Sequence, residues 1–352
     1  MNISVCIITK NEALKLKKCL ASLKRYDVEI VVVDTGSTDE TLQVIEEYAD
    51  IKGNYKWNDN LAEARINSIT LANNASILVL DSDEWIESAD MNLINSILLQ
   101  SDGNIVGRIE RINDINLSDE NVKGTERISR LFNKKYCHYE GRIHEQVVSI
   151  NGDEIETIDV PITAGHSGYA GSADDKKRKS ERNIKLLMMD LMENGASPYT
   201  YYQLGKSYYM QKDYEKASEY FEKGLEYDLN PKLEYVQDMV ETYGYSLLNQ
   251  KRIPEMMFLE NVYNEFSVRA DYVRIMGLAY MNNGLFDKAI DEFNKAKLYK
   301  LCKIEGCNSY KADYNIGVIY ECLGDKEKAL ESYKKCGRYD LALKGIKRLG
   351  CN

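Results

Sequence analysis

The chain has 352 residues, of which 44% are hydrophobic, and its 46 basic and 56 acidic side chains give a formal net charge of −10. This length fits two domains better than one core, and the low content of glycine and proline indicates a folded protein. The acidic balance argues against a nucleic-acid partner, because phosphate binding normally needs a basic face. A nucleotide held through a metal ion is not excluded.

The N-terminal apolar run, residues 3–9, is strand-length and no basic segment precedes it. No later segment approaches 18 uninterrupted apolar residues, so we expect neither a signal peptide nor a membrane span. The eight cysteines lack paired zinc-site spacing, and we interpret them as reduced structural thiols. These observations predict a cytoplasmic protein.

The first half alternates short apolar runs with amphipathic segments. We expect strands at Ile3–Thr9, Glu29–Asp34 and Ser76–Leu80, and helices at Asn11–Leu23, Thr41–Tyr48 and Leu61–Ala72. In the first helix, the side chains expected to face the sheet are Leu14, Cys19, Leu20 and Leu23. This order predicts a mostly parallel α/β sheet, in which ligands bind at the carboxyl ends of the strands.

The strongest chemical signal follows the third of these strands, at Asp81-Ser82-Asp83-Glu84. One carboxylate of such a pair can coordinate a divalent cation while the other accepts hydrogen bonds from a ribose. The cation would neutralise a pyrophosphate leaving group. An isolated Asp-x-Asp is a weak motif, so its interpretation depends on the segments that follow the other strands.

Polar residues also follow the first two strands. Asp34 can accept a hydrogen bond from the imide N–H of uracil, and Thr9-Lys10-Asn11-Glu12 lies at the same rim. Gly36 allows a tight turn, and residues 37–41 are good capping residues. We therefore predict a structural role for residues 37–41.

Four segments in this order resemble glycosyltransferase family 2, which has the GT-A fold: Ile7–Glu12, Val33–Asp39, Leu61–Arg65 and Asp81–Glu84. The resemblance covers about residues 1–170. It implies a base and ribose pocket lined by Thr9, Asn11, Glu12 and Asp34. It also implies that Arg65 lies near the nucleotide, that Asp81 and Ser82 lie near the ribose and diphosphate, and that Asp83 binds Mn²⁺ or Mg²⁺. Ile66 departs from the family, which more often has Asn there.

A second cluster comprises Gly141-Arg142-Ile143-His144-Glu145 and Gly165-His166-Ser167-Gly168-Tyr169. It resembles the family 2 branch that includes lipopolysaccharide glucosyltransferases and bacteriocin S-glycosyltransferases. We hypothesise that His166 completes the metal site or touches the diphosphate, and that Arg142 and His144 meet the sugar or phosphates. An inverting transfer needs a carboxylate as general base. Glu145 is our candidate, and Glu84 competes with it.

From Pro198 the sequence becomes helical and repetitive. Gly205, Gly244, Gly277 and Gly317 recur near the 34-residue tetratricopeptide period. Three of them are followed by an alanine and then an aromatic residue, namely at Ala217, Ala289 and Ala329, whereas Met256 replaces the alanine in the degenerate unit. We predict a catalytic domain at 1–172, a linking helix at 173–197 and an all-α tetratricopeptide-like domain at 198–352. The concave surface of stacked repeats suits a peptide, although the repeats could also serve only as a scaffold.

Our leading interpretation is an inverting, metal-dependent transfer of sugar from a UDP-sugar to a Ser, Thr or Cys side chain of a peptide or protein held by the repeats. A saccharide acceptor in cell-envelope or lipopolysaccharide synthesis and a non-catalytic repeat scaffold remain alternatives. The donor sugar, the linkage atom and the presence of a homo-oligomer stay open. The absence of Gly-x-Gly-x-x-Gly and Walker motifs excludes dehydrogenases and ATPases. A nucleotidyltransferase is disfavoured because no glycine-rich basic loop follows the first strand.

Overall fold

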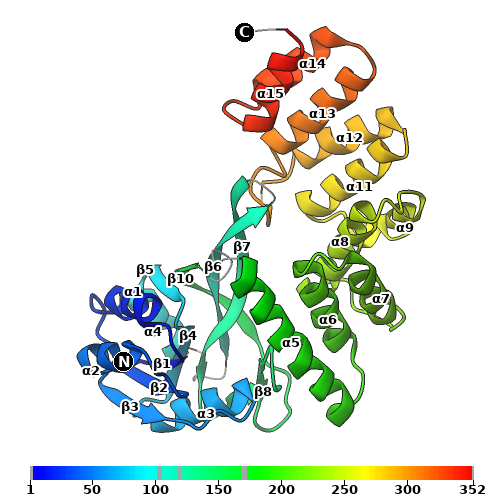
Figure 1. The fold of residues 1–352 in the computed structure, drawn as a ribbon. Helices are drawn as coiled ribbons and strands as arrows, with labels where there is room; N and C mark the ends of the chain where they lie inside the picture. The colour runs from blue at the N-terminus through cyan, green and yellow to red at the C-terminus, as the bar shows by residue number, and fades with distance from the viewer. Residues whose placement is uncertain (1–2, 101–104, 118–119, 168–172, 301, 351–352) are drawn as a thin grey trace. The chain divides into compact units, whose positions relative to one another are not determined.

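The computed structural model describes residues 3–100, 105–117, 120–167, 173–300 and 302–350. The chain divides into two compact units (Figure 1). Each unit has its own hydrophobic core. The first comprises Met1–Asp175 and Lys185–Asp190, and the second comprises Lys176–Ile184 and Leu191–Asn352. The helix α5 (Ala173–Asn194) therefore contributes residues to both units.

An eight-stranded sheet with the order β3-β2-β1-β4-β7-β6-β10-β5 forms the frame of the first unit, among the residues described. Its parallel half consists of β1 (Ile3–Thr9), β2 (Glu29–Asp34), β3 (Ile51–Asn54) and β4 (Ser76–Asp81). The other half consists of β5 (Glu84–Ala89), β6 (Val106–Leu117), β7 (Glu120–Asn133) and β10 (Thr157–His166). This confirms the predicted mostly parallel α/β fold at its N-terminal part.

Beyond Asp81, where we predicted no strand, most strand pairs of the sheet are antiparallel, although β10 runs parallel to β6. β7 runs antiparallel to β4 and to β6, and β5 runs antiparallel to β10 at the edge. A separate two-stranded sheet pairs β8 (Cys137–Glu140) with β9 (Gln146–Ser149). As a result, β5, β6, β7 and β10 bring charged residues far apart in the sequence next to the end of β4.

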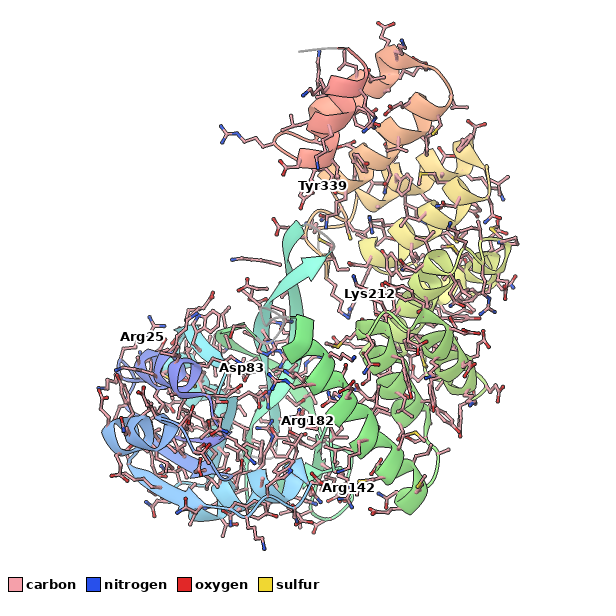
Figure 2. The ribbon with its side chains drawn as sticks, in the orientation of Figure 1. Arg25, Asp83, Arg142, Arg182, Lys212 and Tyr339 are labelled. Atoms are coloured by element: carbon pink, nitrogen blue, oxygen red, sulfur yellow. The ribbon has the colours of Figure 1, made fainter. Side chains whose placement is uncertain are left out.

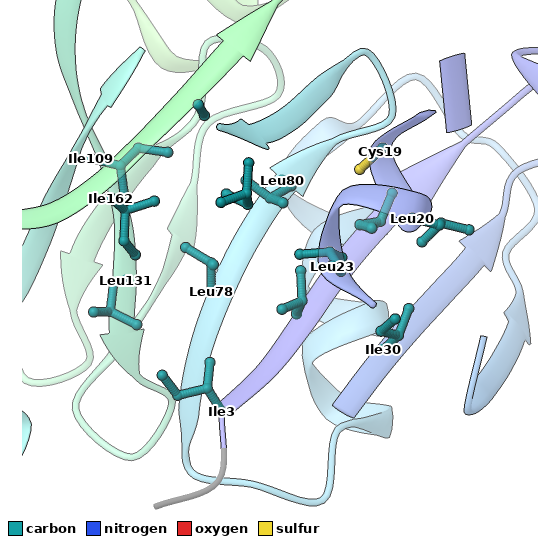
Figure 3. Close-up of a cluster of buried hydrophobic side chains, with 14 of the residues drawn as sticks. Ile3, Cys19, Leu20, Leu23, Ile30, Leu78, Leu80, Ile109, Leu131 and Ile162 are labelled. Carbon is teal, nitrogen blue, oxygen red and sulfur yellow. The ribbon is translucent and has the colours of Figure 1, made fainter. Parts of the chain in front are cut away.

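Apolar side chains from both halves of the sheet and from α1 share one core (Figure 3). The helices of this unit include α1 (Ala13–Leu23), α2 (Thr41–Tyr48), α3 (Leu61–Leu71) and α4 (Met91–Gln100). The prediction that Leu14 faces the sheet was wrong, because its side chain is 86% exposed. Leu16 takes the buried position, at helical spacing from Cys19, Leu20 and Leu23.

The second unit is all-α, as predicted. Its helices after α5 include α6 (Pro198–Met210), α7 (Tyr214–Leu225), α8 (Glu234–Asn249), α11 (Ala270–Asn282), α12 (Phe286–Ala296), α13 (Tyr310–Cys322), α14 (Lys326–Lys335) and α15 (Asp340–Arg348). In three of the helix pairs, α6 with α7, α11 with α12 and α13 with α14, the glycine of the first helix faces an aromatic ring of the second. A Cβ at Gly205, Gly277 or Gly317 would lie 2.4, 2.7 or 2.5 Å from Phe221, Phe293 or Tyr333. These glycines let each helix pair pack closely.

The repeat that contains Gly244 is irregular, as its missing alanine suggested. In place of a second long helix it has the 3₁₀ turn η1 (Pro254–Met257) and the short helices α9 (Phe258–Asn261) and α10 (Tyr263–Phe266). At the other end, the ring of Tyr333 on α14 lies against both Gly317 on α13 and Gly345 on α15. None of the described helices is long and apolar enough to span a bilayer.

Candidate active site

Asp81, the last residue of β4, is held by two arginines. Its Oδ1 lies 2.6 Å from Arg65 Nη2, and its Oδ2 lies 2.7 Å from Arg130 Nη2. Burial alone would raise the pKa of Asp81, but the Arg130 and Arg65 guanidinium groups hold that pKa well below its usual range. The side chain remains 30% exposed, so an ionised carboxylate reaches solvent at the end of the strand.

Glu84 forms buried ion pairs with two arginines, Arg111 and Arg130. Its side chain is fully buried, with Oε1 lying 2.9 Å from Arg111 Nη1 and 3.1 Å from Arg130 Nη2. Its Oε2 accepts the Asp81 backbone N–H at 2.9 Å. A general base must meet the acceptor proton directly or through one water. This burial argues against our prediction of Glu84 as a general base.

Glu145, the other candidate base, forms an ion pair with Arg65 Nε. Arg65 thereby joins Glu145 to Asp81, although eighty residues separate Arg65 from Glu145 in the sequence. Burial would lower the pKa of Arg65, but Asp81 and Glu145 raise it above its usual value. The Glu145 side chain is 6% exposed, so its carboxylate would have to leave Arg65 at least partly to accept a proton.

Asp83 and His166 face one another. Asp83 Oδ1 lies 3.5 Å from His166 Nε2, and the two side chains are 11% and 7% exposed. The backbone brings them together because β10 pairs with β5, where His166 is the register partner of Glu84. The Ser167 N–H also donates to the Asp83 carbonyl oxygen at 3.2 Å.

Asn113 and Glu126 orient the His166 ring. Asn113 Nδ2 lies 2.5 Å from Glu126 Oε1, and because a carboxylate only accepts, the amide N–H₂ must point that way. Asn113 Oδ1 therefore faces His166 Nδ1 at 2.6 Å, and Nδ1–H is the donor. In the neutral ring, the Nε2 lone pair then points towards the Asp83 carboxylate. Two such electron-rich atoms favour a cation between them.

These two ligands fit a divalent ion only in part. Neighbouring ligands of an octahedral Mg²⁺ lie about 3 Å apart at metal–ligand distances of about 2.1 Å, close to the Asp83–His166 separation. No group of three or more His, Cys, Asp or Glu residues suited to a metal is present in the described part of the chain. Asp83 and His166 alone therefore do not complete a metal site, and an ion held by them would need its other ligands from a substrate or water.

The loops after β1 and β2 are fastened to each other. The Asn11 N–H donates to Ser37 Oγ at 2.9 Å, the Thr38 N–H donates to Asn11 Oδ1 at 2.7 Å, and the Glu12 N–H donates to Thr41 Oγ1 at 3.0 Å. Asn11 adopts φ of 53°, a left-handed conformation that asparagine tolerates. The structural role predicted for residues 37–41 is confirmed, and Asn11 shares it.

Asp34 and Thr9 are nearly closed to solvent, with exposed fractions of 5% and 3%. The Asp34 carboxylate accepts the backbone N–H groups of Gly36 and Ser37, each at 2.9 Å. Gly36 has φ of 107°, which strongly favours glycine. Asp34 therefore shapes this loop, whatever it binds.

Glu12 and Ser82 meet across the strand ends. Ser82 Oγ donates to Glu12 Oε2 at 2.5 Å, while Lys15 Nζ lies 2.9 Å from Glu12 Oε1. This contact confirms that the segments following β1 and β4 lie at one rim of the sheet.

Arg142 and His144 lie in the turn between β8 and β9, beside the start of α3. Leu61 N–H donates to the Arg142 carbonyl oxygen at 2.8 Å, and Arg142 Nη1 donates to the Asp59 carbonyl oxygen at 3.3 Å. His144 has φ of 52°. Figure 2 labels Asp83 and Arg142.

Four residues of this network were absent from the sequence interpretation: Arg111, Asn113, Glu126 and Arg130. They belong to β6 and β7, where the isoleucines of β6 recur at every third residue (109, 112 and 115) and β7 has a single isoleucine, Ile128. Neither segment shows the alternation with a period of two that would have predicted a strand, so the sequence offered no signal for these residues. Charges on alternate positions of neighbouring strands can face each other across a sheet.

Comparison with known proteins agrees with this organisation. Residues 4–147 match the model of glycosyl transferase family 2, and residues 198–231 and 310–342 match models of the tetratricopeptide repeat. The segment 4–147 is thus similar to family 2 glycosyltransferases and is followed by segments similar to tetratricopeptide repeats, in agreement with the resemblance noted in the sequence.

Among curated proteins, the chain is similar to the SPbeta prophage-derived glycosyltransferase SunS of Bacillus subtilis, with 26% identity over 279 residues. The match covers 76% of this chain and 64% of SunS. The lipopolysaccharide core biosynthesis glycosyltransferase LpsC of Rhizobium meliloti is 29% identical over 156 residues, which cover 42% of this chain and 57% of LpsC.

Among solved structures, a match is found to YrrB, described as a TPR protein with an unusual peptide-binding site. It has a TM-score of 0.41 and 23% identity, and it covers 48% of this chain and 84% of YrrB.

Proposed function

We propose that this protein is an inverting, divalent-metal-dependent glycosyltransferase that moves a sugar from a UDP-sugar to a Ser, Thr or Cys side chain of a peptide or protein. One observation carries this proposal. Asp83 and His166 present two electron-rich atoms 3.5 Å apart, and the hydrogen bonds from His166 through Asn113 to Glu126 fix the ring orientation. The family 2 domain supplies the reaction class.

Asp83 and His166 would hold Mn²⁺ or Mg²⁺. When bound, the ion neutralises charge on the diphosphate leaving group. Arg130 and Arg65 keep Asp81 ionised in this proposal, so that its exposed side can accept hydrogen bonds from the ribose. The other donor-binding residues that we propose are Thr9, Asn11, Glu12, Asp34, Ser82, Arg142 and His144.

Glu145 remains our proposed general base, in preference to the fully buried Glu84. Its ion pair with Arg65 keeps the carboxylate beside Asp81, and the carboxylate must leave Arg65 at least partly to accept a proton. A thiol acceptor eases this demand, because its pKa of about 8.5 leaves a fraction ionised near neutral pH. A cysteine side chain is therefore the acceptor that suits this site most readily.

The repeats favour a polypeptide acceptor, since stacked helix pairs offer an extended surface for binding other chains. A saccharide acceptor is the second candidate. It is favoured by the similarity to LpsC, whose name assigns it to lipopolysaccharide core synthesis.

A donor screen tests this proposal. The full chain is incubated with UDP- and GDP-sugars, with and without Mn²⁺, and nucleotide release is measured. We expect UDP release that depends on Mn²⁺ and is lost in Asp83→Asn, while the exposed Asp228→Asn on the helical unit serves as the control. Binding of no nucleotide in any condition would contradict the proposal and favour a non-catalytic scaffold.

Peptide and saccharide acceptors are separated in a second reaction. Serine, threonine or cysteine peptides and oligosaccharides are offered with the best donor, and products are identified by their gain in mass. Transfer to the saccharides alone would replace the first candidate acceptor with the second.

A further inference from the structure

One guanidinium group of the helical unit lacks a counter-charge among the residues that the structure describes. Arg274 lies on α11 and is half-buried. Its Nη1 donates to the Tyr245 hydroxyl of α8 at 2.8 Å, whereas its buried Nε meets no acceptor. Asp271, one turn earlier on α11, does not pair with this arginine. It accepts two backbone N–H groups of the chain that precedes α13, at 2.7 and 2.9 Å.

The carboxylates of α8 are balanced by other cations. Asp238 forms ion pairs with Lys206 and Lys303. Glu241 faces the positive charges of Lys303 and Arg269. The positive charge on α11 is therefore left over after the acidic groups around it have found their partners.

Arg274 cannot remove its own charge. Burial lowers the pKa of Arg274, but Tyr245, Cys307 and Tyr339 raise that pKa above its usual value. A guanidinium group stays protonated in proteins, so it cannot escape burial by becoming neutral. A buried charge without a counter-charge is unfavourable. This position therefore favours an anionic ligand.

The free edge of the guanidinium group indicates the shape of that anion. Because Tyr245 engages Nη1, the N–H groups of Nε and Nη2 have no acceptor among the described residues. These two groups lie side by side in the guanidinium plane and point in the same direction. A planar carboxylate can accept a hydrogen bond from each of them at once, with one oxygen for each N–H.

A second buried donor lies on α13. Asn315 is 6% exposed, and its Nδ2 has no acceptor among the described residues. Lys311, which is 5% exposed, lies four residues earlier and hence on the same face of the helix. Burial raises the pKa of the Cys307 thiol to about 12, and the charges of Arg274 and Lys311 oppose that rise. The two cations therefore lie close enough to act on one buried thiol.

We propose that Arg274 binds a carboxylate of the acceptor polypeptide through its Nε and Nη2 groups, with Lys311 and Asn315 as neighbouring donors. The carboxylate belongs to an aspartate or glutamate side chain or to a free C-terminus. The identity of the polypeptide as acceptor rests on the proposed function, while the binding itself does not depend on sugar transfer. Such a site gives the enzyme a preference for acceptors that carry a carboxylate at this point.

The test uses the full chain and three N-acetylated peptides in isothermal titration calorimetry. The first is Gly-Ser-Tyr-Glu-Ser-Gly with an amidated C-terminus, and the second has glutamine in place of glutamate. The third has the same glutamine and a free C-terminal carboxylate. At least one of the two peptides with a carboxylate should bind about tenfold or more tightly than the neutral peptide. The peptide that does so identifies the source of the carboxylate.

Two substitutions of the arginine separate its charge from its shape. Arg274→Gln should abolish the preference, and we expect it to fold because the charge that it removes has no counter-charge. Arg274→Lys keeps the charge but lacks the planar fork, so it should lose most of the preference. Arg252→Gln, which removes a half-buried arginine of the same unit paired with Glu255, is the control and should leave the preference intact.

Equal affinity for all three peptides, binding of none of them, or a preference that survives Arg274→Gln would overturn the carboxylate site. UDP release is measured on the same proteins. A carboxylate preference without UDP release would contradict the sugar transfer alone. UDP release without a carboxylate preference would contradict the carboxylate site alone.

Discussion

At the scale of single residues, the candidate site depends on how a few buried arginines are shared between buried carboxylates. Arg130 is the central group, because its Nη2 contacts both Asp81 and Glu84. Buried ion pairs contribute little net stability, but removal of one partner leaves the other charge unpaired in the protein interior, where a charge is unfavourable. Arg130 is thus a residue whose loss should affect folding before it affects chemistry.

Arg130→Met should destabilise the first unit by about 3–5 kcal/mol, because Asp81 and Glu84 would lose a shared cation. Urea unfolding followed by tryptophan fluorescence measures this, since both tryptophans lie in the first unit. Arg108→Met, which removes a partly exposed arginine of β6 paired with Asp159, is the matched control and should cost about 1 kcal/mol or less. A similar loss in both variants would contradict the central role of Arg130.

The pH dependence of stability follows from the lowered pKa of Asp81. A carboxyl whose folded pKa is depressed contributes stability above its unfolded pKa of about 3.9, and this contribution is lost as the pH falls towards the folded value. Below pH 4, Asp81→Asn should therefore lose less stability than the wild type does. Acid titrations of unfolding would check this, and parallel curves for the two proteins would argue against it.

Asn113→Leu should weaken Mn²⁺ binding by about 10–100-fold, because His166 Nδ1 loses the acceptor that sets its orientation. Electron paramagnetic resonance of free Mn²⁺ gives the affinity without any need for turnover. Asn249→Leu, at an exposed position on α8, provides the control. An unchanged Mn²⁺ affinity in Asn113→Leu would show that Asn113 does not need to orient the His166 ring for the ion to bind.

At the scale of elements, how much the sequence revealed depended on the kind of strand. The strands Ile3–Thr9 and Glu29–Asp34 and the helix Thr41–Tyr48 were predicted with their observed bounds, because the strands are mostly apolar and the helix has its apolar residues at helical spacing. We did not predict the strands β6 and β7. Their buried charged residues look like surface residues in the sequence, because their partners Asp81 and Glu84 lie on other strands. Asp83 and His166 were predicted together from the family resemblance, whereas the role of Asn113 required the register between β6 and β10.

The helix pair of α11 and α12 provides a test of close packing. In a helix interior, Gly→Ala normally stabilises by about 1 kcal/mol. Gly277→Ala should instead destabilise by about 1–3 kcal/mol, because the new methyl group would lie 2.7 Å from the Phe293 ring. Phe293→Leu in the same chain should relieve part of this cost, and a double-mutant cycle by urea unfolding would measure the coupling. Additive effects would show that the ring is not the obstacle.

At the scale of the whole molecule, two units with separate cores should unfold as two transitions. Arg130→Met and Gly277→Ala identify which transition belongs to which unit. UDP with Mn²⁺ should then raise the temperature of the first unit's transition alone, by mass action on its folded state. Differential scanning calorimetry is the measurement, and a single transition shifted as a whole by UDP with Mn²⁺ would contradict independent units.

The ring of Tyr333 lies between Gly317 and Gly345, so α15 covers one side of this ring. A chain cut before Asp340 would bare one side of that ring together with Ala329 and Cys336, which share its cluster. Stacked repeats propagate wherever an apolar end is left open. Such a truncated chain would expose an apolar surface at the end of its helices. We expect it to polymerise before it loses catalytic activity.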